Sequence, residues 1–238
     1  KNYKPKLSYT FDESNILNNQ EIYEIEIELL NDKVGPNKLF NDVDKIESLL
    51  KKTITHVLSG LQKTNYPISY VEQNEVIQDY LKLIGKESEK RVNTSDFCGP
   101  SSYTLQMKNI VPLDEMSKTP NIRDYYTVTD KADGERKLMY ISKSGKIYLI
   151  NTNMEIEFTG VKSKDKEQYN SLLDGEHILH DKFGNYINLY AAFDIYFIKN
   201  NSVRELGFVP IDQEEEKSKF RLPLLISYID KLDFKEGK

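Results

Sequence analysis

A short polar loop near the middle of the chain carries residue types suited to covalent chemistry on a phosphate. In residues 126–141, Lys131 is followed by Asp133-Gly134 and then by Arg136. A lysine can act as a covalent nucleophile once its pKa is lowered, and both basic side chains can reach the phosphates of a nucleotide. Gly134 permits a tight turn and a close approach of the backbone to a ligand. The alternative is an ordinary hairpin with a charged tip, because Asp-Gly is a common turn dipeptide.

Two further polar clusters interrupt apolar runs downstream of this loop. Asp174 and Glu176 flank Gly175, and Asp194 follows Phe193 in a strongly apolar stretch. A buried aspartate without a partner is costly, so Asp194 needs a cation or a metal nearby. Taken alone, each cluster also fits a turn or a structural salt bridge.

The elements that must position these residues follow from the spacing of the apolar runs. Short apolar runs separated by glycine-containing turns predict antiparallel strands in the second half of the chain. These runs are residues 126–129, 138–141, 146–150, 154–158, 172–180 and 186–198. A helix is expected over residues 220–232, and a short one over residues 164–169.

The first part of the chain combines strands with helices. Alternating patterns predict strands over residues 3–11 and 21–30. Apolar residues at helical spacing predict helices over residues 42–61 and 71–84, the second ending at Gly85. A polar stretch follows, so a domain boundary is expected near residues 85–95.

An acidic ladder lies on the second of these expected strands. Glu24, Glu26 and Glu28 alternate with apolar residues and would share one strand face. A solvated face is one explanation, although stacked carboxylates repel each other and glutamate is a poor strand former. The other explanation is a site for Mg²⁺ or Mn²⁺, which prefer oxygen ligands. It would lie opposite Lys4 and Lys6.

Composition excludes several classes of protein. The chain has 238 residues, a net charge of -5 and one cysteine. It is therefore not a basic nucleic-acid coat, a disulfide scaffold or a cysteine-based zinc protein. Neither a signal peptide nor an apolar run of membrane-spanning length is found, so no membrane contact is expected. A single cysteine suits a reducing compartment, and the absence of an initiator methionine suggests a fragment.

Together, the three clusters resemble the motifs of the covalent nucleotidyltransferases, which are messenger-RNA guanylyltransferases and ATP-dependent polynucleotide ligases. The pattern Lys-x-Asp-Gly-x-Arg at Lys131 is similar to their first motif. Residues 174–176 look like the third motif, and Phe193-Asp194 like the next one. The resemblance covers residues 97–198, and the order and gaps of the clusters fit.

The acidic stretch narrows this resemblance. Residues 4–11 and 23–28 resemble the last strands of a tunnel-type, metal-dependent RNA triphosphatase. A triphosphatase directly ahead of a guanylyltransferase is the arrangement of capping enzymes from large cytoplasmic DNA viruses and cytoplasmic linear plasmids. The resemblance thus favours messenger-RNA capping over ligation. No residue recognisably distinguishes guanine from adenine.

The resemblance implies a role for each of these residues. Lys131 would form a covalent lysine–GMP adduct with GTP, and Arg136 and Glu176 would hold the ribose. Phe193 would stack on the base, and Asp133 and Asp194 would orient the loop or a metal. In the preceding domain, Glu24, Glu26 and Glu28 would bind Mg²⁺ or Mn²⁺, and Lys4 and Lys6 would contact the RNA 5′-triphosphate.

The implied fold is α+β. Residues 1–90 would hold the end of a triphosphatase tunnel with a helical linker. Residues 91–238 would hold an incomplete antiparallel nucleotidyltransferase domain, with the ATP-grasp-like fold of ligases and capping enzymes. Expected partners are GTP, RNA with a 5′-triphosphate or 5′-diphosphate, and a methyltransferase domain or subunit. The expected location is the host cytoplasm or the virion.

Three parts of the family pattern are missing from the chain. These are the first acidic triphosphatase strand, the fourth and fifth nucleotidyltransferase motifs, and the oligonucleotide-binding fold that follows them. The fragment alone is therefore expected to be inactive. The alternatives are an ATP-dependent polynucleotide ligase and a non-catalytic scaffold segment of a capping enzyme.

Overall fold

A computed structural model describes residues 7–14, 23–86, 92–112, 119–123, 126–211 and 216–236. The chain divides into two compact units, residues 1–54 and residues 55–238. The second unit contains the sheet and most of the predicted functional residues. No helix in the described ranges has the length and apolar character needed to cross a membrane.

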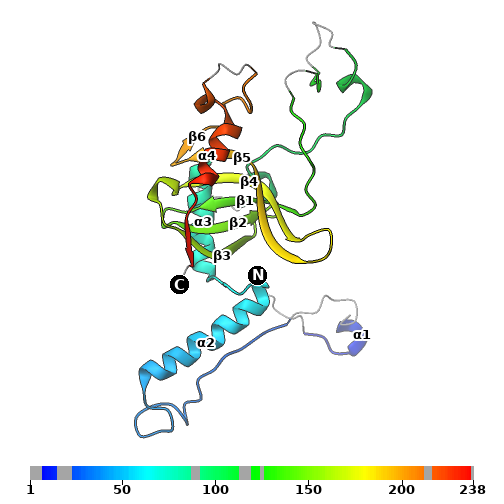
Figure 1. Cartoon of the computed structure of the whole chain (residues 1–238). Helices are drawn as coiled ribbons and strands as arrows, with labels where there is room; N and C mark the ends of the chain where they lie inside the picture. Colours follow the sequence, from blue (N-terminus) through cyan, green and yellow to red (C-terminus); the bar gives the residue numbers. More distant parts are fainter. Residues whose placement is uncertain are drawn as a thin grey trace. The chain divides into compact units, whose positions relative to one another are not determined.

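One antiparallel sheet of seven strands forms the centre of the second unit (Figure 1). Its spatial order is β6-β5-β4-β1-β2-β3-β7. The strands are β1 (Glu135–Ile141), β2 (Lys146–Asn151), β3 (Ile156–Ser163), β4 (Ser171–His180), β5 (Tyr186–Ile198), β6 (Asn201–Ser202) and β7 (Phe234–Glu236). The strand that carries Arg136 therefore lies beside the strand that carries Asp174 and Glu176.

Helices cover both faces of this sheet. α3 (Tyr70–Leu83) packs Val76, Tyr80 and Leu81 into a cluster with Leu138 and other residues of one face. α4 (Arg221–Asp230) packs on the opposite face, where Leu225 joins a separate cluster. In Figure 1, α3 (cyan) and α4 (red) lie against the sheet. The 3-10 turns are η2 (Thr94–Asp96), η3 (Met107–Asn109), η4 (Lys166–Gln168) and η5 (Lys217–Lys219).

The secondary structure expected over residues 135–230 is largely confirmed. Strand and helix positions agree within a few residues, because apolar runs and glycine turns mark each element. Residues 126–133 form no strand, so the Lys131 loop is not a hairpin tip. The prediction of a strand over residues 126–129 is wrong. This stretch is exposed, and Val128 is fully open to solvent, so no neighbouring strand in the described part of the chain covers it.

The strands expected near the start of the chain are wrong where the structure describes them. Residues 23–30 adopt no regular structure and are exposed, and α1 (Phe11–Ser14) forms a short helix at the end of the other expected strand. Alternation fits a strand only if a neighbouring strand satisfies its backbone, and the described residues offer residues 23–30 no such neighbour. The helix expected after them is confirmed as α2 (Val43–Gln62).

The position of α3 bears on the expected domain division. α3 falls within residues 1–90 yet buries its apolar face on the sheet of the second unit. The assignment of residues 1–90 and 91–238 to two catalytic domains remains a prediction. The packing places α3 with the sheet that carries Arg136, Asp174 and Glu176.

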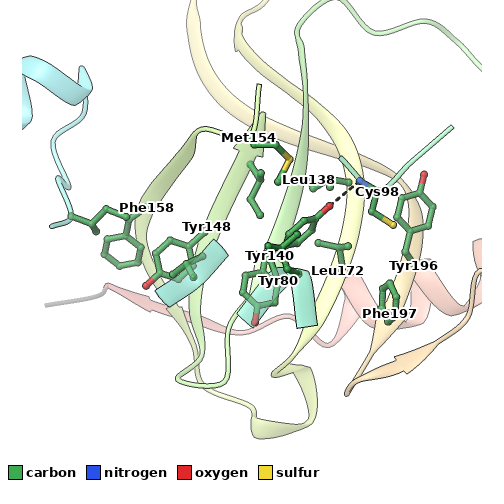
Figure 2. Packing of buried hydrophobic residues seen from close by; sticks show 14 residues of the cluster. Tyr80, Cys98, Leu138, Tyr140, Tyr148, Met154, Phe158, Leu172, Tyr196 and Phe197 are labelled. Atoms are coloured by element: carbon green, nitrogen blue, oxygen red, sulfur yellow. Dashed lines mark hydrogen bonds between the residues drawn. The ribbon is translucent and has the colours of Figure 1, made fainter. Parts of the chain in front are cut away.

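The Tyr80 hydroxyl ties this helix to the segment that follows it. The hydroxyl donates to the carbonyl of Asp96 and accepts from the amide of Cys98, at 2.8 Å in each case. Figure 2 shows Tyr80 in the cluster with its bond to Cys98. Burial raises the pKa of the Cys98 thiol, so this residue suits a structural role better than a nucleophilic one. Tyr80 thereby fixes the start of the segment that leads toward Arg136.

Replacing Tyr80 by phenylalanine should destabilise the fold. The change leaves two backbone groups without their partner, so we expect the free energy of unfolding to fall by about 1–3 kcal/mol. Urea titration measures this. Tyr140→Phe is the matched control, because Tyr140 is equally buried and has no described hydroxyl hydrogen bond. An equal loss in both variants would contradict the role assigned to the Tyr80 hydroxyl.

Glu72 makes a second link between α3 and the sheet. Its Oε1 accepts from Lys146 Nζ and from the Tyr148 hydroxyl, both at 2.7 Å. Burial opposes ionisation of Glu72, but these two hydrogen bonds and the positive charge of Lys146 together outweigh it and hold the pKa of Glu72 below its ordinary value. The link is therefore complete only when Glu72 is ionised.

Glu72→Gln should destabilise the protein at neutral pH and much less in acid. Because the folded pKa is lowered, the stabilisation is present above the unfolded pKa and disappears as pH falls through the folded one. We expect a loss of about 1 kcal/mol at pH 7 and convergence of the two proteins as the pH falls through the folded pKa of Glu72, measured by urea unfolding. Glu75→Gln, an exposed change on the same helix, is the control. A loss independent of pH would show that packing, not charge, is responsible.

Candidate active site

A buried ion pair joins β1 to β4 at the centre of the candidate site. Arg136 Nε and Nη2 lie 3.1 Å and 2.5 Å from the two carboxylate oxygens of Asp174. Asp174 is fully buried, and the Tyr196 hydroxyl donates to its Oδ2 at 2.6 Å. Hydrogen bonding to Asp174 raises the pKa of Arg136. Asp174 therefore orients Arg136 and is not itself open to a ligand.

The segment 97–100 closes over the Arg136 side chain. Arg136 Nη1 donates to the Pro100 carbonyl at 2.7 Å, and the guanidinium carbon lies 5.3 Å from the centre of the Phe97 ring. A Cβ on Gly99 would come within 2.5 Å of Arg136 Nη2, so only glycine fits there. These bonds use three of the five N–H donors of a guanidinium. The remaining donors can face a ligand.

Gly134 attaches the Lys131 loop to β4. Its amide donates to Glu176 Oε1 at 3.2 Å. A Cβ at this position would lie 2.5 Å from the carbonyl oxygen of His177, so the close approach requires glycine. Arg136 and Glu176 are direct partners in the β1–β4 ladder. The structure thus brings together the first-motif and third-motif residues that the sequence singled out.

Lys131 is exposed at the free end of this loop. Its Nζ lies 2.9 Å from Asp133 Oδ1, and the two side chains are 86% and 96% exposed. The Asp133 carboxylate raises the pKa of Lys131. Arg136, whose positive charge could lower this pKa if it faced Lys131, is engaged by Asp174 instead. Lys131 stands in its protonated state, paired to its own loop.

β5 delivers side chains to the site through three irregularities in its pairing. β4 has 10 residues and β5 has 13, and register shifts absorb the difference. The extra residues of two shifts are Tyr196 and Phe193, and the third shift includes Asn188. Such bulges re-aim a side chain out of the regular alternation. Phe193 is 39% exposed, as a base-stacking residue requires.

Asp194 has a partner, as its burial requires. Arg221 at the start of α4 lies 2.8 Å from Asp194 Oδ1 through Nε and 3.2 Å from Oδ2 through Nη2. Arg221 also donates to the Leu206 carbonyl. The pair joins β5 to α4, which places Asp194 in the scaffold beside Phe193. Contact with a ligand would have to compete with Arg221.

The acidic residues predicted to hold a metal are not brought together. Glu24, Glu26 and Glu28 lie in the exposed irregular stretch, and Lys4 and Lys6 fall outside the described residues. Within the described ranges, no three His, Cys, Asp or Glu side chains are placed to hold a metal ion. As arranged, the three glutamates do not fit Mg²⁺ or Mn²⁺.

An open pocket of about 350 Å³ lies beside the Lys131 loop. It is lined by Asp133, Gly134, Glu135, His177, Leu179 and His180. Sequence reasoning missed His177 here, as it missed Tyr80, Gly99 and Tyr196 around Arg136. Spacing alone could not find Tyr196, because a bulge places it. Gly99 did carry a signal, since it precedes proline, but that dipeptide reads as an ordinary turn.

Comparison with known proteins matches the sequence of this chain to one family. Residues 45–210, more than half of the chain, match the model of the mRNA capping enzyme catalytic domain. A "Probable mRNA-capping enzyme" of Acanthamoeba polyphaga mimivirus is 29% identical over 185 residues. The match covers 76% of this chain and 13% of that relative's length. The chain therefore belongs to the mRNA capping enzyme family.

Proposed function

We propose that this chain contributes the guanylyltransferase step of messenger-RNA capping. The observation that carries the proposal is the joining of Arg136, Asp174 and Glu176 across β1 and β4, directly beside the Lys131 loop. That arrangement supports a nucleotide site with a lysine nucleophile. Membership of the capping enzyme family favours GTP as the nucleotide.

In the proposed reaction, neutral Lys131 attacks the α-phosphorus of GTP. An Nζ–P bond forms, the bond from that phosphorus to the bridging oxygen breaks, and pyrophosphate leaves. The terminal oxygen of a 5′-diphosphate RNA then attacks the same phosphorus. The Nζ–P bond breaks, the cap is released and Lys131 regains a proton.

The other residues supply binding and orientation. Arg136 and Glu176 hold the ribose, with Asp174 fixing the direction of the guanidinium. Phe193 presents its ring to the base. Asp133 exchanges its partner when Lys131 turns to the phosphate, because the pair is fully open to water. Separation of Lys131 from Asp133 does not by itself make the amine neutral. A positive charge that arrives with the nucleotide would lower the pKa of Lys131 and favour its neutral form.

The triphosphatase activity, and the need for Mg²⁺ or Mn²⁺, remain predictions from the sequence resemblance. They rest on Glu24, Glu26 and Glu28 and on a strand that the described residues do not form. A methyltransferase partner and a cytoplasmic location are likewise predictions. The ligase and scaffold alternatives make different predictions about covalent labelling.

Lys131→Ala should abolish covalent labelling of the full-length protein by GTP. Removing the amine removes the only bond that could survive denaturation, so α-labelled GTP should mark the wild-type band but not the variant on a denaturing gel. Lys143→Ala is the matched control, because Lys143 is also exposed and lies 2.9 Å from an aspartate, Asp79. Labelling by ATP alone would favour a ligase, and none by either nucleotide would favour a scaffold.

Tyr196→Phe should slow formation of the adduct through Arg136. Loss of the hydroxyl leaves Asp174 with one donor fewer, so the guanidinium is held less firmly and we expect about a tenfold lower rate. Tyr228→Phe is the matched control, since its buried hydroxyl donates to the Gln168 carbonyl at 2.8 Å near α4. Single-turnover labelling and urea unfolding separate the effects. Equal rates in the two variants at equal stability would contradict the role of Tyr196.

A further inference from the structure

Lys137 forms a polar cluster on the sheet face opposite Arg136. Neighbouring strand residues point to opposite faces, and the Lys137 residue is only 9% exposed. Its Nζ lies 3.0 Å from Glu157 Oε2, 3.3 Å from Glu135 Oε2 and 3.1 Å from His177 Nδ1. This cluster lies next to the Lys131 loop and has no place in the proposed reaction.

The contacts of His177 define its protonation state. An ammonium group only donates hydrogen bonds, so Nδ1 of His177 must accept from Lys137. The ring is then neutral and carries its proton on Nε2. That atom lies 2.8 Å from Asn188 Oδ1, which can accept the proton. The neutral ring therefore satisfies both neighbours at once, and the protonated ring cannot.

Asn188 reaches this position at a conformational cost. It lies in the register shift of β5 between the pairs Ile178–Leu189 and His180–Tyr186. Its φ is 46°, in the left-handed region that asparagine tolerates better than most residues. Unfavourable backbone conformations inside regular elements cluster at functional sites. Here the conformation belongs to the residue that holds the far nitrogen of His177.

His177 also supports the loop directly. Its carbonyl oxygen is the atom that a Cβ at Gly134 would meet at 2.5 Å. Glu135 and His177 form the first pair of the β1–β4 ladder, so the ring anchors the end of β1 next to the loop. His177 also lines the pocket with Asp133 and Gly134.

We propose that His177 is a positioning residue for the Lys131 loop, and that it holds the loop only as a neutral imidazole. The neutral ring joins Lys137 on β1 to Asn188 on β5 across β4. This fixes the position of the His177 carbonyl oxygen next to Gly134. Because Gly134 ends the loop that carries Lys131, the position of the loop is fixed as well. The catalytic consequence rests on the proposed guanylyltransferase function, whereas the structural consequence does not.

Protonation of His177 reverses its effect. The imidazolium would place a second positive charge 3.1 Å from Lys137 Nζ and would lose the acceptor that Lys137 uses. The ring contacts Lys137 on β1 and Asn188 on β5. Of the other polar groups nearby, Glu135 on β1 and Glu157 on β3 are bonded to Lys137, Tyr190 on β5 is the ladder partner of His177, and Asp133 in the loop and His180 on β4 line the same pocket. Both glutamates remain bonded to Lys137, so the sheet survives while the link from His177 to Lys137 is lost.

The first test is the pH dependence of adduct formation in the full-length protein. Single-turnover rates with α-labelled GTP are measured between pH 5.5 and 8.5. Lys131 must lose a proton in every variant, so all rates fall in acid. We expect the wild-type rate to fall more steeply than that of His177→Gln, whose amide cannot gain a proton. The ratio of variant to wild-type rate should rise about tenfold from neutral to mildly acidic pH.

Two further variants sharpen this test. His56→Gln removes an exposed imidazole on α2 and should keep the wild-type profile. Asn188→Gly keeps the positive φ without strain but deletes the acceptor, so it should lower the rate severalfold at neutral pH without loss of stability. A pH-independent ratio for His177→Gln, or an unchanged rate in Asn188→Gly, would overturn the proposal.

Hydrogen exchange separates this proposal from the guanylyltransferase assignment. Without nucleotide, and after correction for the intrinsic effect of pH, the peptide spanning residues 130–138 should lose protection on acidification in the wild type but not in His177→Gln. If protection changes this way and no GTP labelling occurs, the positioning role stands and the proposed function fails. If labelling occurs but protection is independent of His177, the positioning role is wrong.

Discussion

The ion pair between Arg136 and Asp174 is the interaction on which the site depends. Asp174 is fully buried, and a buried charge that loses its partner typically costs about 3–5 kcal/mol. The fold must therefore pair β1 with β4 in the register that brings Arg136 to the Asp174 carboxylate. Tyr196 supplies the remaining donor, and the segment 97–100 covers the guanidinium. The same constraint extends to α3, because the Tyr80 hydroxyl holds the amide of Cys98 within that segment.

β5 meets this constraint by departing from regular pairing. A strand with strict alternation would send neighbouring side chains to opposite faces, so Tyr196 and Phe197 could not both pack in the cluster on the α3 face. The extra residue in the ladder resolves this conflict. A second shift includes Phe193, and a third turns Asn188 toward His177. The longest strand of the sheet is thus also the most irregular, and its irregularities coincide with the site.

Much of the sheet was predictable from the sequence, whereas the contacts that orient the site were not. Apolar runs and glycine turns located β1 to β5, because burial on both faces demands continuous apolar sequence. Motif spacing identified Lys131, Arg136 and Glu176, but not the pairing of Arg136 with Asp174, since spacing along a strand contains no register. Tyr196 and Asn188 depend on bulges, which period-two reasoning cannot detect. The strand prediction for the acidic stretch was wrong for the opposite reason. The alternation of residues 23–30 is regular, but the described residues offer no neighbouring strand with which they could pair.

The two ends of the candidate site differ in how firmly they are held. Arg136 is fixed by Asp174, Pro100 and the cover of Phe97, and Glu176 is tied to the amide of Gly134. Lys131 lies three residues away from that attachment and is exposed, and its partners are the exposed Asp133 carboxylate and the carbonyl of the adjacent Ala132. An ion pair open to water contributes little and exchanges partners readily. The arrangement therefore suits a division of roles. Arg136 and Glu176 form a rigid subsite that orients the nucleoside, and Lys131 is a nucleophile that can adjust its position to the bound nucleoside. Because the raised pKa of Lys131 comes from Asp133, activation of the amine must begin with separation of that pair.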